Sequence, residues 1–396
     1  MTSRSKTIGS IFILAGTTIG AGMLALPLTS AGLGFGTSVA IMVGIWILMA
    51  YTGLLMLELH QHVPITATLH GLAEQFLGWK GRATATVAML FLLYALCAAY
   101  IAGGGALMQE RIIGHLPGMP AFSGALVFTL IIGLVVSLGT SKVDFINRIL
   151  FVLKLIVLVV TMVMLTPQVS GGYLLNLPVE QGLLVAALPV IFTSFGFHSC
   201  IPSLVRYTNK DMASLRKIVL IGSSLPLVIY IIWQGLSFGA VGQAGLMQNN
   251  DLPDFVNSIA AVVQSEWVVA AITLFADLAL ATSFLGVSLG LFDFLADKFQ
   301  RPNNKRGRMQ TGLITFLPPL VFALFYPQGF IIALGYAAIA LVVIAIILPV
   351  LMVRKARLDY DEASYQVAGG NLGLYLAMFI GGLVILAQLA VAFKLV

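Results

Sequence analysis

Long apolar stretches alternate with short polar segments along the whole chain. Stretches of roughly 20 apolar residues match the hydrocarbon thickness of a bilayer when they are helical. The alternating ten-residue strands of a membrane barrel do not occur in this pattern. The pattern therefore predicts eleven transmembrane helices. The predicted spans are about 7–30, 35–58, 84–109, 122–140, 145–166, 182–205, 217–240, 267–292, 311–326, 329–352 and 372–393.

The composition supports a membrane protein. Of the 396 residues, 59% are hydrophobic and 9% are charged, whereas a soluble domain has about 25% charged residues. The polar segments between the spans are too short to form a soluble domain. Cys97 and Cys200 both fall inside spans, where we expect no disulfide. The fold class that follows is an all-α integral membrane protein.

The basic residues gather in alternate loops. Cytoplasmic loops of membrane proteins carry an excess of Lys and Arg, so this distribution predicts a cytoplasmic N-terminus and a periplasmic C-terminus. It also accounts for the net charge of +6 without a nucleic acid partner. We expect the chain to be surrounded by membrane lipid.

Two spans contain poor helix formers near their middle. In the first, GTTIGAGMLALP (16–27) holds three glycines and a proline, and in the sixth, FTSFGFHSCIPSLV (192–205) holds Gly196 and Pro202. Glycine in a helix interior costs about 1 kcal/mol relative to alanine, and proline more. Close helix packing is one interpretation, because Gly16 and Gly20 form a GxxxG pattern. The other is that helices 1 and 6 are broken.

The two interruptions occupy corresponding places in the two halves of the chain. Span 1 runs outward and span 6 inward, as in two five-helix units related by inversion. Interrupted spans in corresponding positions are typical of the binding site of a secondary transporter. We therefore predict a 5+5 inverted repeat with units at 1–166 and 167–352, followed by a loop and one further helix at 353–396.

An interrupted helix offers backbone groups to a ligand. The free N–H groups near Gly20–Gly22 suit a carboxylate, and free carbonyls near Phe192–Ser194 suit an ammonium group. Tyr94 and Tyr100 in span 3 are candidates to close an aromatic pocket, or are core residues. The candidate substrate-binding residues are Gly16, Thr17, Thr18, Gly20, Ala21, Gly22, Phe192, Thr193, Ser194, Phe195, Gly196, Phe197, His198, Tyr94 and Tyr100.

Ionisable residues inside a membrane are expensive and are functional candidates. Lys154 in span 5 and Asp277 in span 8 lie at similar predicted depth, so either a structural ion pair or an ion-coupling site is possible. Thr282 and Ser283 add hydroxyl groups on span 8. A buried lysine can lose and regain a proton. This favours proton coupling over sodium, because the chain already supplies the positive charge.

Signatures of an enzyme or of a cofactor site do not occur in the sequence. There is no HExxH, GxSxG or Walker motif, so we expect neither catalysis nor a cofactor. Glu58, His60 and His62 in ELHQH have a spacing that resembles a metal site. We interpret them as solvated residues at the end of a span and predict no metal.

Several long blocks resemble the bacterial hydroxy/aromatic amino acid permeases: GTTIGAGMLALP, PVIFTSFGFH, FADLALATSFLG, LGLFDFLAD and TGLITFLPPLVFALFYPQGF. The resemblance covers essentially the whole chain. It implies a transporter of the amino acid–polyamine–organocation superfamily with the leucine-transporter-like fold, importing L-tyrosine with protons across a bacterial inner membrane. By the same resemblance, residues 16–22 and 193–198 hold the substrate backbone.

The resemblance also places Thr282 and Ser283 near the cation, with Lys154 as the counterpart of a span 5 lysine. A tryptophan, phenylalanine or broader aromatic amino acid carrier remains an alternative, as does sodium coupling or exchange on the same fold. A passive channel is a further alternative from another class, although it would show a continuous polar or charged ring over several spans.

Overall fold

The computed structural model describes residues 3–179, 182–263, 265–302, 304–360 and 365–395, and all regular structure in these ranges is helical. The α-helices are α1 (Ser3–Thr18), α2 (Gly22–Ser30), α3 (Gly34–His60), α4 (Leu69–His115), α5 (Ser123–Ser137), α6 (Thr140–Leu165), α7 (Gly182–Ser194), α8 (Ile201–Tyr207), α9 (Met212–Val241), α10 (Gln243–Met247), α11 (Leu252–Val263), α12 (Glu266–Lys298), α13 (Lys305–Phe325), α14 (Phe330–Val342), α15 (Leu348–Asp359) and α16 (Gly370–Ala392).

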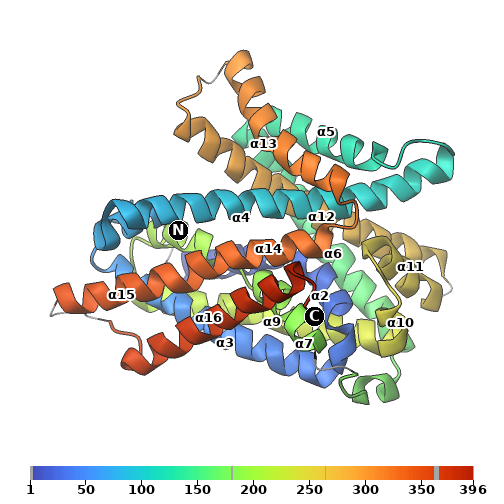
Figure 1. Ribbon diagram of the computed structural model, residues 1–396, viewed down its shortest axis with the longest axis horizontal. Helices are drawn as coiled ribbons and strands as arrows, with labels where there is room; N and C mark the ends of the chain where they lie inside the picture. Colours follow the sequence, from blue (N-terminus) through green and yellow to red (C-terminus); the bar gives the residue numbers. More distant parts are fainter. Residues whose placement is uncertain (1–2, 180–181, 264, 303, 361–364, 396) are drawn as a thin grey trace.

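Short helical pieces of other types connect some of these helices. They are the 3₁₀ turns η1 (Ala31–Leu33), η2 (Thr166–Gln168), η3 (Gly171–Leu175) and η4 (His198–Cys200), and the π-helical turn η5 (Val343–Ile347). Through η5, α14 and α15 form one long segment. Figure 1 shows this segment, α4 and α16 lying lengthwise through the molecule, with α5 and α13 along one edge.

The prediction of an all-helical membrane protein is confirmed. Within the described residues, nine helical segments are long and apolar enough to cross a membrane. Each of the eleven predicted spans falls on helical structure, the first on α1 and α2 and the sixth on α7, η4 and α8. The helices α1 and α5 have only 16 and 15 residues, and one of the nine segments, Gly22–His60, joins α2 to α3. The helix α11 is a further short apolar helix. The difference between nine and eleven therefore reflects the short helices α1 and α5 and the joining of α2 to α3, not missing helices.

Small residues let some of these helices pack closely. A Cβ on Gly105 of α4 would lie 2.7 Å from the Cα of Ala125 on α5.

Helix caps fix the boundaries of some helices. The Asp211 carboxylate accepts a hydrogen bond from the Ser214 amide at the start of α9. Together with the Ser214 hydroxyl, this bond holds the pKa of Asp211 below its usual range. The cap follows directly from local sequence, whereas the close approach of α4 and α5 also depends on how the helices pack.

A buried ion pair fastens α3 to α15. The Arg357 guanidinium donates to both oxygens of Glu58, at 2.7 and 2.9 Å, and the Glu58 side chain is only 2% exposed. The Val367 amide adds a bond of 2.8 Å to the same carboxylate. The interpretation of Glu58 and His60 as solvated residues was wrong, because both are buried. The sequence does not show that Arg357 of α15 packs against Glu58.

We expect Arg357→Gln to destabilise the protein by about 3–5 kcal/mol, since it leaves a buried carboxylate without its cation. Thermal unfolding in detergent measures the effect as a lower Tm. Arg148→Gln is the matched control, because Arg148 forms an exposed pair with Asp144 in the same helix, worth about 0.3–0.5 kcal/mol. Equal Tm shifts for the two variants would contradict a structural role for the Glu58–Arg357 pair.

Candidate functional site

The two glycine-containing stretches coincide with gaps between helices. Helix α1 ends at Thr18 and α2 begins at Gly22, while α7 ends at Ser194 and the turn η4 begins at His198. The two gaps lie against each other, because a Cβ on Gly22 would be 3.0 Å from the Ser194 Oγ. Residues far apart in the sequence thus form one backbone-rich cluster, which we call the central cluster.

Tyr230 of α9 joins the ends of the two helices that stop there. Its hydroxyl lies 2.7 Å from the Thr18 carbonyl and 2.9 Å from the Ser194 carbonyl. The last carbonyls of a helix have no partner within the helix, and Tyr230 supplies one from a third helix. The Phe195 ring packs edge-on against the Tyr230 ring, with centroids 5.2 Å apart. Sequence reasoning missed Tyr230; its only signal was a hydroxyl inside an apolar span.

Ser283 of α12 contacts the first gap from the other side. The Ala21 amide donates to the Ser283 Oγ at 3.0 Å, and Tyr100 of α4 lies beside the same side chain. A Cβ on Gly20 would lie 2.8 Å from this oxygen. The neighbouring Thr282 instead bonds to the Leu278 carbonyl of its own helix. Of the two span 8 hydroxyls, the one on Ser283 therefore meets the central cluster.

Lys154 of α6 reaches the same gap with its charged end. Its Nζ donates to the Ile19 carbonyl at 2.9 Å, and the side chain is buried. The ammonium also lies 4.7 Å from the centroid of the Phe151 ring, and that ring covers Gly16. The structure therefore brings Lys154 to the central cluster through backbone contacts.

The second gap is lined by aromatic rings and a buried histidine. The Nε2 of His198 lies 2.9 Å from the Thr52 Oγ1 of α3, and the Phe197 ring stacks on the His198 ring. Thr193 donates to carbonyls of Pro189 and Leu334. Phe192, Phe195, Phe197 and His198 are all buried. Thr52 is another residue that the sequence did not single out.

The hydroxyls that precede the first gap differ in exposure. Thr17 and Thr18 bond to the carbonyls of Ile13 and Leu14, one helical turn back. Thr18 is buried whereas Thr17 is exposed.

Tyr94 is not brought to the central cluster. Its hydroxyl donates to the Ile314 carbonyl of α13 at 2.8 Å, on the side of α4 that meets α13. The six-residue separation from Tyr100 turns the two rings to different faces of the helix. Of the two candidate tyrosines, only Tyr100 contacts the residues around the gaps.

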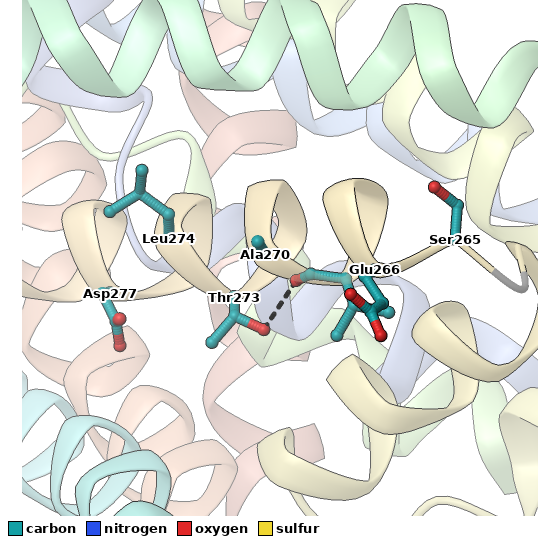
Figure 2. Close-up of a pocket in the computed structure, with 7 residues that line it drawn as sticks. Ser265, Glu266, Ala270, Thr273, Leu274 and Asp277 are labelled. Carbon is teal, nitrogen blue, oxygen red and sulfur yellow. Dashed lines mark hydrogen bonds between the residues drawn. The ribbon is translucent and has the colours of Figure 1, made fainter.

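Asp277 also lies apart from Lys154. Its carboxylate accepts hydrogen bonds from the Arg111 guanidinium of α4 at 2.7 and 2.8 Å. Asp277 therefore forms an ion pair with Arg111, and not the pair with Lys154 that was considered from the sequence. Asp277 lines a groove of about 550 Å³ on one face of α12. Figure 2 shows Glu266, Thr273 and Asp277 along that groove. Arg111 lies beyond the predicted span 84–109, so the sequence did not suggest this pairing.

The described part of the chain contains no group of three or more His, Cys, Asp or Glu residues that could hold a metal ion. The central cluster is instead made of backbone amides and carbonyls, hydroxyls and one lysine. These groups can bind the ammonium and carboxylate of a small zwitterion.

Comparisons with known proteins agree with this chemistry. Residues 3–388 match the tryptophan/tyrosine permease family. The chain is 42% identical to the "Tyrosine-specific transport system 1" of Haemophilus influenzae over 389 residues, covering 96% of each protein. It is 41% identical to "Tyrosine-specific transport system 2" of the same organism, covering 97% of this chain and 96% of the relative.

A third relative in that organism is named for a different substrate. The chain is 35% identical to its "Tryptophan-specific transport protein", over 96% of this chain and 95% of the relative. Similarity over nearly the full length, together with the membrane-spanning helices, leads to one conclusion. The chain belongs to the tryptophan/tyrosine permease family and is a multi-pass membrane permease for aromatic amino acids, not an enzyme.

Proposed function

We propose that the protein imports L-tyrosine across the bacterial inner membrane by proton symport with alternating access. The observation that carries the proposal is the contact between the Lys154 ammonium and the Ile19 carbonyl, inside the first gap. It joins a proton-carrying group to the backbone where the substrate would bind. Tyrosine is chosen over other aromatic amino acids because two similar relatives are tyrosine-specific by name.

The substrate would bind through the backbone of the central cluster. Amides near Gly20–Gly22 would take the carboxylate, since helix α2 begins there and its dipole favours an anion. Carbonyls near Phe192–Ser194 would take the ammonium at the end of α7. The phenol ring would lie among Tyr100, Phe195 and Phe197. The central cluster in this state holds some of these groups internally, as Ser283 does with the Ala21 amide.

Lys154 would couple this binding to protons. While charged, its ammonium holds the Ile19 carbonyl; deprotonation would weaken that bond, because a charged donor makes the stronger hydrogen bond. Movement of α1 and α2 would then follow the protonation state. Ser283, and Thr282 beside it, would provide the neighbouring hydroxyls. Asp277 would act at a distance, through its pair with Arg111.

The architecture that we propose is the 5+5 inverted repeat. Residues 1–166 would form one unit and 167–352 the other, with helices 1 and 6 broken at the two gaps and α16 outside the repeat. Backbone without helical partners is tolerated inside a membrane where protein or a water-filled cavity surrounds it. The charge pattern supports a cytoplasmic N-terminus and a periplasmic C-terminus.

Purified protein in proteoliposomes tests the proposal. With a pH gradient, acidic outside, we expect accumulation of labelled tyrosine that collapses with a protonophore and does not need sodium. Unlabelled tyrosine should compete more strongly than tryptophan or phenylalanine. Stronger competition by tryptophan would favour the second candidate, a tryptophan carrier, which the 35% identical relative supports. Accumulation that requires sodium and ignores the pH gradient would overturn proton coupling.

A further inference from the structure

A cavity of about 190 Å³ lies beside the second gap, and its lining includes hydroxyl, imidazole and guanidinium groups. It is lined by two parts of α4, by η4 and α8, and by Phe294 of α12. One water needs about 10–15 Å³ of such space, so the cavity has room for several waters or for a solvated ionic group. It is separate from the groove at Asp277 and shares no lining residue with it.

A bend in α4 builds one wall of this cavity. Gly78 has φ +69°, inside an otherwise helical segment, and this backbone region is accessible mainly to glycine. The bend places His70, from before it, and Thr86, from after it, on the same cavity. A Cβ on Gly81 would lie 2.5 Å from the Leu77 side chain, so the bend itself is tightly packed.

The opposite wall is one face of the segment that follows the second gap. Ser199, Ser203 and Arg206 have the i, i+4, i+7 spacing of a single helical face, and all three line the cavity. Ser199 directly follows buried His198 and is itself exposed. The hydroxyls of Ser199 and Ser203 therefore lie between the central cluster and the Arg206 side chain along this segment.

Charge defines what this cavity can bind. Arg206 is exposed, and its hydrogen bond to the Thr66 carbonyl is long, at 3.4 Å. None of the described residues that line the cavity is acidic. A guanidinium presents five N–H donors in a fork that matches a carboxylate. Surrounding hydroxyls from Ser199, Ser203 and Thr86 can donate to the same anion.

We propose that this cavity is a second binding site for the carboxylate of the transported amino acid, on the cytoplasmic side, with Arg206 as its charged partner. The inference rests on the proposed function. The amino acid occupies this site after it leaves the central cluster. Arg206 therefore takes no part when the amino acid binds from the periplasm. Arg206 therefore sets the affinity at the cytoplasmic face alone.

The test compares tyrosine transport in everted and right-side-out membrane vesicles that contain the wild type or Arg206→Gln. We expect Arg206→Gln to raise the KM about tenfold in everted vesicles, the loss of one charge-assisted contact, and to leave the KM in right-side-out vesicles unchanged. The KM of Arg206→Lys in everted vesicles should lie between the values for the wild type and for Arg206→Gln. Arg148→Gln, an exposed arginine outside the cavity, should match the wild type at both faces.

Tyramine, which lacks the carboxylate, identifies the group that is bound. In everted vesicles of the wild type, tyrosine should compete with labelled tyrosine far better than tyramine does, and Arg206→Gln should reduce that difference. An unchanged KM in everted vesicles, or an equal change at both faces, would overturn the second site. Wild-type vesicles that fail to transport tyrosine would instead overturn the proposed function.

Discussion

Lys154→Met is expected to abolish accumulation of tyrosine against its gradient while leaving exchange of internal for external tyrosine. Methionine has similar length and keeps the apolar stem, but it removes the ammonium that bonds to the Ile19 carbonyl at 2.9 Å. Without a group that gains and loses a proton at the central cluster, the proton gradient no longer drives transport. Proteoliposomes measure both activities, with net uptake under a pH gradient and counterflow without one.

Lys142→Met provides the matched control on the same helix. Lys142 lies at the start of α6 and is exposed, so its replacement should leave accumulation close to the wild type. A second readout separates coupling from folding, because Lys154→Met should still bind tyrosine in detergent. Concentrative uptake by Lys154→Met would show that the lysine is structural and would contradict our account of coupling.

Gly20→Val is expected to abolish tyrosine binding and uptake, although the protein still inserts and folds. A Cβ at this position would lie 2.8 Å from the Ser283 Oγ, and real Cβ contacts are essentially never that short. The added methyl groups would also cover the Ala21 amide, which we assign to the substrate carboxylate. Binding of labelled tyrosine to purified protein, alongside gel-filtration behaviour, measures the two effects separately.

Gly9→Val is the corresponding control. Gly9 lies within α1, before the first gap that contains Gly20, and a Cβ there would meet nothing within 4 Å. The two substitutions therefore introduce the same side chain into the same predicted span, with and without contact to the central cluster. Normal uptake by Gly20→Val would refute binding through the backbone at the first gap.

The candidate site was predictable where it depends on backbone chemistry. Glycines at 16, 20 and 22, and the small polar residues around Gly196, are unusual in a spanning helix, and both stretches fall at helix ends in the structure. Lys154 was found because a charge inside a membrane is rare. These signals are local, so one sequence is enough to see them.

The contacts between helices were not predictable in the same way. Tyr230 joins Thr18 to Ser194, yet nothing in its own span distinguishes it from a core tyrosine. Arg111 pairs with Asp277 across 166 positions of the chain, and depth alone had suggested Lys154 as the partner. Which faces of two distant helices meet depends on how all the helices pack, and hydropathy carries no information about that.

The sequence by itself determined the class of the molecule. The apolar runs required spanning helices, because a bilayer core provides no water for backbone groups. The poor helix formers near the middle of spans 1 and 6 located the positions where those helices end. Only the tertiary structure decided that Ser283, Lys154 and Tyr230 converge on these ends, because helix rotation and packing set which side chains meet.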